Sequence, residues 1–158
     1  MHSEFHRNTR IVAPVPLVWQ EMDSLEAILA KSPHFLTYQL SGEGERALVT
    51  AELSWGPLKC GVEGTAEIRS PQPQQQTGYV VSVPSLGLRY TATIRIAPSS
   101  PTETTLDYSA DLEIGNRMAE RMRGLFNELI EDHIQGLTTR VKTRAEHRRQ
   151  ADERLFYL

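Results

Sequence analysis

The sequence predicts an α+β fold in which a curved antiparallel sheet of about six to seven strands wraps around one long C-terminal helix. From about residue 116 to residue 144, apolar side chains recur at steps of three and four, which is typical of one broad face of an amphipathic helix. Most of the chain before this helix alternates apolar and polar residues, which is typical of half-buried antiparallel strands. Because a helix with so wide an apolar face needs a large apolar surface to lie on, the strands are its expected partner.

The first predicted elements are one strand and two short helices. Residues 4–12 predict the strand, and the prolines at positions 14 and 16 end it. Both prolines suit the first turn of a helix, here over residues 17–22. Asp23-Ser24 can cap a second short helix over residues 25–30.

Further strands follow up to the long helix, separated by turns and by polar loops at residues 70–76 and 98–103. Alternation is clearest in residues 58–69, where apolar or small side chains face one way and charged side chains face the other. The predicted strands cover residues 35–41, 47–55, 58–69, 77–84, 88–96 and 106–114.

The inward face of this sheet mixes aliphatic residues with three tyrosines and with small residues. The tyrosines are Tyr79, Tyr90 and Tyr108, and the small residues are Gly64, Ala66, Ala92 and Ala110. Small residues opposite a bulky helix either allow close packing or leave a cavity, and close packing is the usual state of protein interiors. Both outcomes are compatible with the sequence.

Length and composition predict one ordinary globular domain. The 158 residues have 39% hydrophobic residues, 23% charged residues and a net charge of −3, which gives no global nucleic-acid footprint. The single cysteine, Cys60, cannot form an internal disulfide. No signal peptide or membrane span is expected, so we predict a cytoplasmic protein, monomeric or dimeric. The expected division is a single domain over residues 1–145 and a basic C-terminal extension over residues 146–158.

Three segments carry a family resemblance. Residues 10–19 combine a strand, an Ala-Pro turn and a helix with Trp19. Residues 53–64 contain the turn Gly56-Pro57-Leu58-Lys59 and end in glycine, and residues 106–115 form a last strand that also ends in glycine. The first segment resembles the opening of the START-like (SRPBCC) superfamily. The other two resemble its carbon monoxide dehydrogenase G and polyketide cyclase-like branch.

The resemblance implies a helix-grip fold with a cavity between the sheet and the C-terminal helix. The implied ligand is hydrophobic: a lipid, an isoprenoid quinone or a polyketide-like molecule. The carbon monoxide dehydrogenase G branch implies quinone binding or recruitment of a redox partner to the membrane, whereas the cyclase branch implies aldol chemistry guided by the shape of the cavity. Since one fold hosts many functions, the resemblance does not decide among them.

We expect the cavity wall to combine apolar side chains from the last strands and from the start of the long helix. His34 and Tyr38 are expected near its entrance, where the second short helix meets the sheet. The methionines suit an adaptable wall, although methionine at helical spacing also occurs in ordinary cores. The predicted wall residues are Leu88, Tyr90, Tyr108, Met118, Met122 and Phe126.

Candidates for catalysis are few, and no catalytic residue is assigned. His133 lies on the apolar face of the long helix, where an imidazole can act as a general base or bind a carbonyl; the alternative is a core histidine. Tyr90 is the second candidate. The five histidines are scattered without ligand spacing, so we predict neither a metal site nor a cofactor.

Three functions remain open. The first is a non-enzymatic carrier or binder of a hydrophobic small molecule. The second is a cyclase or aromatase, which needs His133 or Tyr90 inside the cavity. The third is an accessory protein that docks on a membrane surface or a protein partner through the basic tail, whose last residues, 155–158, are apolar.

Overall fold

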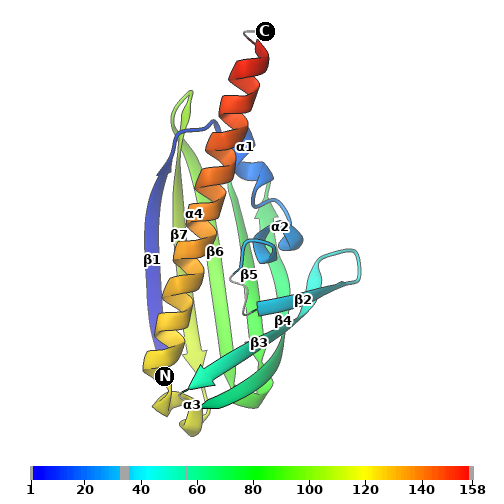
Figure 1. The fold of residues 1–158 in the computed structure, drawn as a ribbon, viewed down its shortest axis with the longest axis vertical. Helices are drawn as coiled ribbons and strands as arrows, with labels where there is room; N and C mark the ends of the chain where they lie inside the picture. The colour runs from blue at the N-terminus through cyan, green and yellow to red at the C-terminus, as the bar shows by residue number, and fades with distance from the viewer. Residues whose placement is uncertain (1, 33–35, 56, 157–158) are drawn as a thin grey trace.

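The computed structural model describes residues 2–32, 36–55 and 57–156, which contain a seven-stranded antiparallel sheet (Figure 1). The strands lie in the order β1-β7-β6-β5-β4-β3-β2, so consecutive strands are neighbours except for β1, which pairs with β7. The predicted α+β class and the antiparallel sheet are confirmed. The strands are β1 (His2–Ile11), β2 (Leu36–Ser41), β3 (Arg46–Trp55), β4 (Leu58–Gln72), β5 (Gln76–Val83), β6 (Leu88–Ser100) and β7 (Glu103–Ile114).

Two strands run into the segments that the sequence predicts as polar loops. β4 continues to Gln72 and β6 continues to Ser100. Each extension contains a proline, Pro71 in β4 and Pro98 in β6, and the pairing register shifts at the same place. Because an irregular ladder leaves a residue unpaired, it tolerates a proline that has no N–H to donate.

The two predicted short helices are present as α1 (Val15–Gln20) and α2 (Leu25–Leu29), followed later by a 3-10 turn, η1 (Pro84–Leu86). The predicted cap of α2 is confirmed, since the Ser24 hydroxyl accepts a hydrogen bond from the Ala27 N–H at 3.0 Å. Both helices lie beside the C-terminal half of the long helix (Figure 1).

The predicted long helix is divided into α3 (Arg117–Arg121) and α4 (Arg123–Phe156). Asn116 caps α3, and the backbone leaves helical geometry at Met122, where ψ is 14°. α4 then runs for 34 residues across the concave face of the sheet (Figure 1). It crosses the predicted division at residue 145 without a break, and that division stays a prediction. None of the helices in the described part of the chain has the length and apolar character needed to cross a membrane.

Charged groups join α4 to the segment of α1 and α2. Glu21 and Lys31 are almost completely buried and form an ion pair at 3.1 Å. Arg148 of α4 lies 2.9 Å from the other Glu21 oxygen, and the Glu146 carboxylate accepts a hydrogen bond from the Val12 N–H at 3.0 Å. Part of the basic tail therefore contacts its own domain.

The inward face of the sheet packs differently at its two ends. Towards the C-terminal half of α4, buried residues such as Ile134, Leu137 and Val141 join Ile11 and Val18 in one closed core. Towards the N-terminal half of α4, the core gives way to a pocket. The fold therefore contains both outcomes that the small inward residues allowed, close packing and a cavity.

Candidate ligand-binding site

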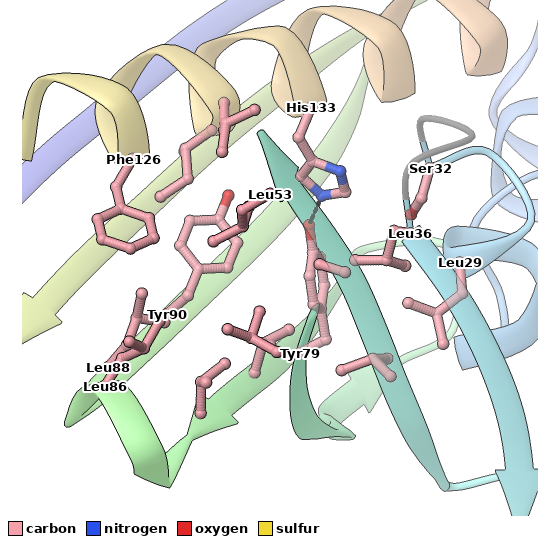
Figure 2. Close-up of a pocket in the computed structure, with 17 residues that line it drawn as sticks. Leu29, Ser32, Leu36, Leu53, Tyr79, Leu86, Leu88, Tyr90, Phe126 and His133 are labelled. Carbon is pink, nitrogen blue, oxygen red and sulfur yellow. Dashed lines mark hydrogen bonds between the residues drawn. The ribbon is translucent and has the colours of Figure 1, made fainter. Parts of the chain in front are cut away.

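A pocket of about 130 Å³ lies between the N-terminal half of α4 and strands β3 to β6 (Figure 2). Its walls are almost entirely apolar, and the polar side chains in it are Ser32, Tyr79, Tyr90 and His133. The remaining lining residues are Leu29, Leu36, Val49, Ala51, Leu53, Val62, Val81, Val83, Leu86, Leu88, Phe126, Leu129 and Ile130. An apolar hollow with a few convergent polar groups is the usual form of a small-molecule site.

Alternation along three neighbouring strands supplies the polar side of the pocket. Tyr79 on β5, Tyr90 on β6 and Tyr108 on β7 all point to the concave face, and each is at most 5% exposed. His133 comes down onto them from α4, with its ring edge-on to both Tyr79 and Tyr90 at centroid distances of 6.2 and 6.3 Å.

The four side chains form one continuous hydrogen-bond chain. The Tyr90 and Tyr108 hydroxyl oxygens are 2.5 Å apart, and those of Tyr108 and Tyr79 are 2.6 Å apart. The Tyr79 hydroxyl in turn lies 2.7 Å from Nε2 of His133, the contact drawn in Figure 2. Tyr108 does not line the pocket, so it links two lining residues from behind.

Burial sets the protonation state of this chain. Desolvation, with a smaller contribution from the positive charge of Arg140, lowers the pKa of His133 from 6.5 to about 4. Desolvation also raises the pKa of Tyr79, Tyr90 and Tyr108 well above 10. At neutral pH all four groups are therefore uncharged, and the imidazole carries one proton.

Ser32 adds a further polar group to the pocket. Its hydroxyl oxygen is buried and has no hydrogen-bond partner within the described part of the protein. A buried hydroxyl without a partner costs roughly 1–3 kcal/mol, which a ligand or a water molecule can recover by bonding to it.

No protein-family model and no curated protein sequence matches the chain. Solved structures do match. The Zhui aromatase/cyclase from Streptomyces sp. R1128 has a TM-score of 0.68 over 94% of this chain and 96% of that chain, at 13% identity. The di-domain aromatase/cyclase StfQ from the steffimycin pathway has a TM-score of 0.68 at 13% identity, over 95% of this chain and 52% of that chain. A norcoclaurine synthase variant from Thalictrum flavum, bound to a transition-state analogue, has a TM-score of 0.63 at 15% identity over 94% and 97% of the two chains.

The protein has the helix-grip fold. The predicted fold is thus confirmed by the order of its elements and by these neighbours. At 13–15% identity the likeness concerns the fold, and it does not single out the carbon monoxide dehydrogenase G branch, which stays a prediction.

The helix-grip pocket contains only some of the predicted ligand-binding residues. Leu88, Tyr90 and Phe126 line it, and so does His133, the first candidate for catalysis. Tyr108 contributes only through its hydrogen bonds. Whether these residues bind a ligand stays a prediction.

The other predicted residues lie elsewhere. Met118 is 76% exposed on α3 and does not take the expected place in the wall, because the break at Met122 turns the first helical segment away from the sheet. Met122 and Tyr38 are partly buried against the core but do not line the pocket. His34 lies outside the described residues.

Tyr79 is the most important pocket residue that the sequence prediction leaves out of the site. The sequence identifies it as an inward tyrosine, and its position on the same sheet face as Tyr90 and Tyr108 is the signal that points to it. The aliphatic lining residues of β3 and β5 are also missing from the prediction, because any inward position of a sheet has the same pattern.

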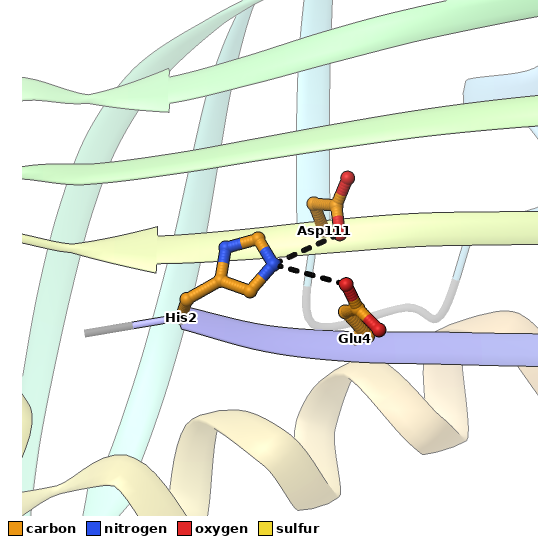
Figure 3. A group of neighbouring side chains, drawn as sticks. All are labelled: His2, Glu4 and Asp111. Atoms are coloured by element: carbon orange, nitrogen blue, oxygen red, sulfur yellow. Dashed lines mark hydrogen bonds and ion pairs between the residues drawn. The ribbon is translucent and has the colours of Figure 1, made fainter.

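A second group of possible ligand atoms lies on the convex face of the sheet (Figure 3). Nε2 of His2 is 3.4 Å from a Glu4 oxygen and 3.3 Å from an Asp111 oxygen. The pairing of β1 with β7 brings these residues together, which the spacing of histidines along the sequence does not reveal. All three side chains are at least 50% exposed, so we interpret the group as a surface ion-pair cluster.

Proposed function

We propose that the protein binds a compact hydrophobic small molecule in the pocket beneath α4. The observation that carries this proposal is a hollow with apolar walls that also contains a buried Ser32 hydroxyl without a partner among the described residues and the lining side chains of Tyr90 and His133. Apolar walls favour burial of a hydrophobic body, and the few polar groups favour a ligand that carries one polar atom.

The volume of the pocket limits the size of the ligand. Sites for drug-sized molecules measure about 300–1,000 Å³, whereas an engineered cavity of roughly 150 Å³ in another protein holds benzene. A pocket of about 130 Å³ suits a single six-membered ring. A lipid, an isoprenoid quinone or a polycyclic polyketide is larger, so these predicted ligands require the pocket to widen.

A filling substitution tests this proposal. Ala51 lines the pocket from β3, while its neighbour Thr50 is exposed on the opposite face of the same strand. Titration with a single-ring probe such as toluene, followed by nuclear magnetic resonance, should show binding to the unmodified protein and to Thr50→Leu. Ala51→Leu should weaken that binding at least tenfold. Equal affinity for all three proteins would place the probe outside this pocket and refute the proposal.

An enzyme of the cyclase or aromatase type is the second candidate. It is favoured by the direct contact of His133 with a chain of tyrosines at the pocket wall. The accessory role through the basic tail has less support, because Arg148 bonds to Gln20 at 2.6 Å and Arg149 to the Val12 carbonyl at 3.3 Å, within the domain.

A further inference from the structure

The hydrogen-bond chain from Tyr90 to His133 has a fixed number of contacts and protons. It contains three contacts, namely Tyr90 to Tyr108, Tyr108 to Tyr79, and Tyr79 to Nε2 of His133. Each contact holds one proton, and the three neutral tyrosines supply three. The neutral imidazole has one more proton, on either Nε2 or Nδ1.

The position of that imidazole proton decides the direction of every bond in the chain. With the proton on Nδ1, Nε2 accepts from Tyr79, all three hydroxyl protons are used, and the Tyr90 oxygen can only accept a further bond. With the proton on Nε2, each bond reverses and the Tyr90 hydroxyl is free to donate. The two ends are therefore always opposite: when Nδ1 accepts, Tyr90 donates, and when Nδ1 donates, Tyr90 accepts.

Both ends belong to residues that line the same pocket. Tyr90 and His133 are lining residues, and their ring centroids are 6.3 Å apart. In Figure 2 the second ring nitrogen of His133 lies on the side of the ring towards Ser32, away from the bond to Tyr79. One six-membered ring is long enough to reach both ends at once.

Moving charge through this chain is unfavourable, but moving protons in concert is not. A protonated His133 is disfavoured because its pKa is lowered to about 4, and a tyrosinate is disfavoured because burial raises the tyrosine pKa values. A concerted shift along all three bonds leaves every residue neutral at its beginning and its end. It therefore avoids the charged states that the buried site resists.

We infer that the tyrosine–histidine chain catalyses the keto–enol interconversion of a compact cyclic ketone bound in the pocket. The α-carbon C–H bond breaks and its proton goes to Nδ1 of His133, while the C–H electron pair forms the C=C bond. The Nε2 proton moves to the Tyr79 oxygen, the Tyr79 proton to Tyr108, and the Tyr108 proton to Tyr90. Tyr90 gives its own proton to the former carbonyl oxygen, so one proton leaves the substrate and one returns.

This inference rests on the proposed function, since the ketone must first occupy the pocket. In this reaction His133 and Tyr90 are the catalytic residues, because they contact the reacting atoms. Tyr108 is a positioning residue that relays a proton without contacting the substrate, since it does not line the pocket.

Tyr108→Phe is therefore the decisive variant. The probe is cyclohexanone in D₂O, and proton nuclear magnetic resonance follows both its binding and the loss of its α-proton signals by exchange with deuterium. The unmodified protein should accelerate exchange, and general acid–base catalysis contributes typically about 10²–10⁴-fold. Tyr108→Phe should bind cyclohexanone within about twofold of the unmodified protein while exchange falls about 100-fold or more. Tyr38→Phe, which removes a hydroxyl outside the chain, is the matched control and should change neither quantity.

A second measurement needs no variant. Nitrogen chemical shifts of the His133 imidazole report which ring nitrogen carries the proton. Cyclohexanone accepts a hydrogen bond from Tyr90, so its binding should move the proton of His133 to Nε2. A tautomer that stays on Nδ1 when the ketone binds would overturn the coupling between the two ends.

The outcomes separate the two proposals. If cyclohexanone does not bind, the proposed function fails and the catalytic inference fails with it. If cyclohexanone binds but exchange is no faster than in buffer, or is equally fast in Tyr108→Phe, the catalytic inference alone is overturned and the binding function stands.

Discussion

Acidification below pH 6.5 should destabilise the fold through His133. Between pH 6.5 and about 4 the unfolded chain protonates this histidine and the folded chain does not, because burial lowers the folded pKa to about 4. The unfolded state then binds more protons, so the free energy of unfolding falls as the pH falls. The stability is fully present above pH 6.5 and is lost as the pH approaches 4.

The size of the effect follows from the two pKa values. They differ by about 2.5 pH units, and each pH unit corresponds to about 1.36 kcal/mol, so the full loss is about 3 kcal/mol. At pH 5 the loss relative to pH 7 is about 2 kcal/mol. Such a change is a large fraction of the stability of an ordinary domain.

Urea unfolding at pH 7, 6 and 5 measures this loss, with His133→Gln as the control. The glutamine amide oxygen can accept the hydrogen bond from Tyr79 but does not titrate. Other histidines and carboxylates titrate equally in both proteins, so the difference between the two unfolding free energies isolates His133. That difference should change by about 2 kcal/mol between pH 7 and pH 5. A constant difference over this range would show that His133 is not a desolvated histidine and would refute the reasoning.

Three further predictions concern the remaining buried groups. Glu21→Gln should lower the unfolding free energy by about 3–5 kcal/mol because it leaves the buried Lys31 ammonium without its partner, whereas Arg148→Ala, at a half-exposed side chain, should cost less than about 1 kcal/mol; equal costs in urea unfolding would contradict the buried ion pair. Phe126→Ala should cost about 3–5 kcal/mol and enlarge the pocket, so toluene should raise its melting temperature more than that of the unmodified protein, and an equal rise would argue against the pocket wall. Tyr108→Phe should cost about 1–3 kcal/mol in urea, since two buried hydroxyls lose their shared partner; a neutral effect would indicate that water replaces it.

The arrangement of strands and helices follows from periodicity, and its errors follow from breaks in periodicity that the sequence does not mark. Residues 117–122 keep the apolar spacing of the following helix, so nothing in them signals that the backbone bends at Met122. The extensions of β4 and β6 are the opposite case. Pro71 and Pro98 usually end a strand, but here the ladder shifts register around them and the strand continues.

The site is harder to predict than the fold because it depends on register. The sequence places three tyrosines on the inward face, but it does not say which residues lie opposite them. In the sheet, Tyr79 pairs with Ala92 and Tyr108 pairs with Ile94, and both partners belong to β6. A shift of one residue in either pairing would turn one tyrosine to the convex face and remove its hydroxyl from the chain.

The small inward residues have a function that neither close packing nor a cavity describes. Ala92 pairs with Tyr79 on one side and with Ala110 on the other, and Tyr90 lies two residues before it on the same face. These two alanines leave the space above the sheet in which the tyrosine rings converge, so that three hydroxyls from three different strands come within hydrogen-bond distance. A larger side chain at Ala92 would stand between the rings and separate them. The same small residues that could have allowed α4 to pack tightly on the sheet therefore allow a polar chain to form beneath it, with the pocket beside that chain.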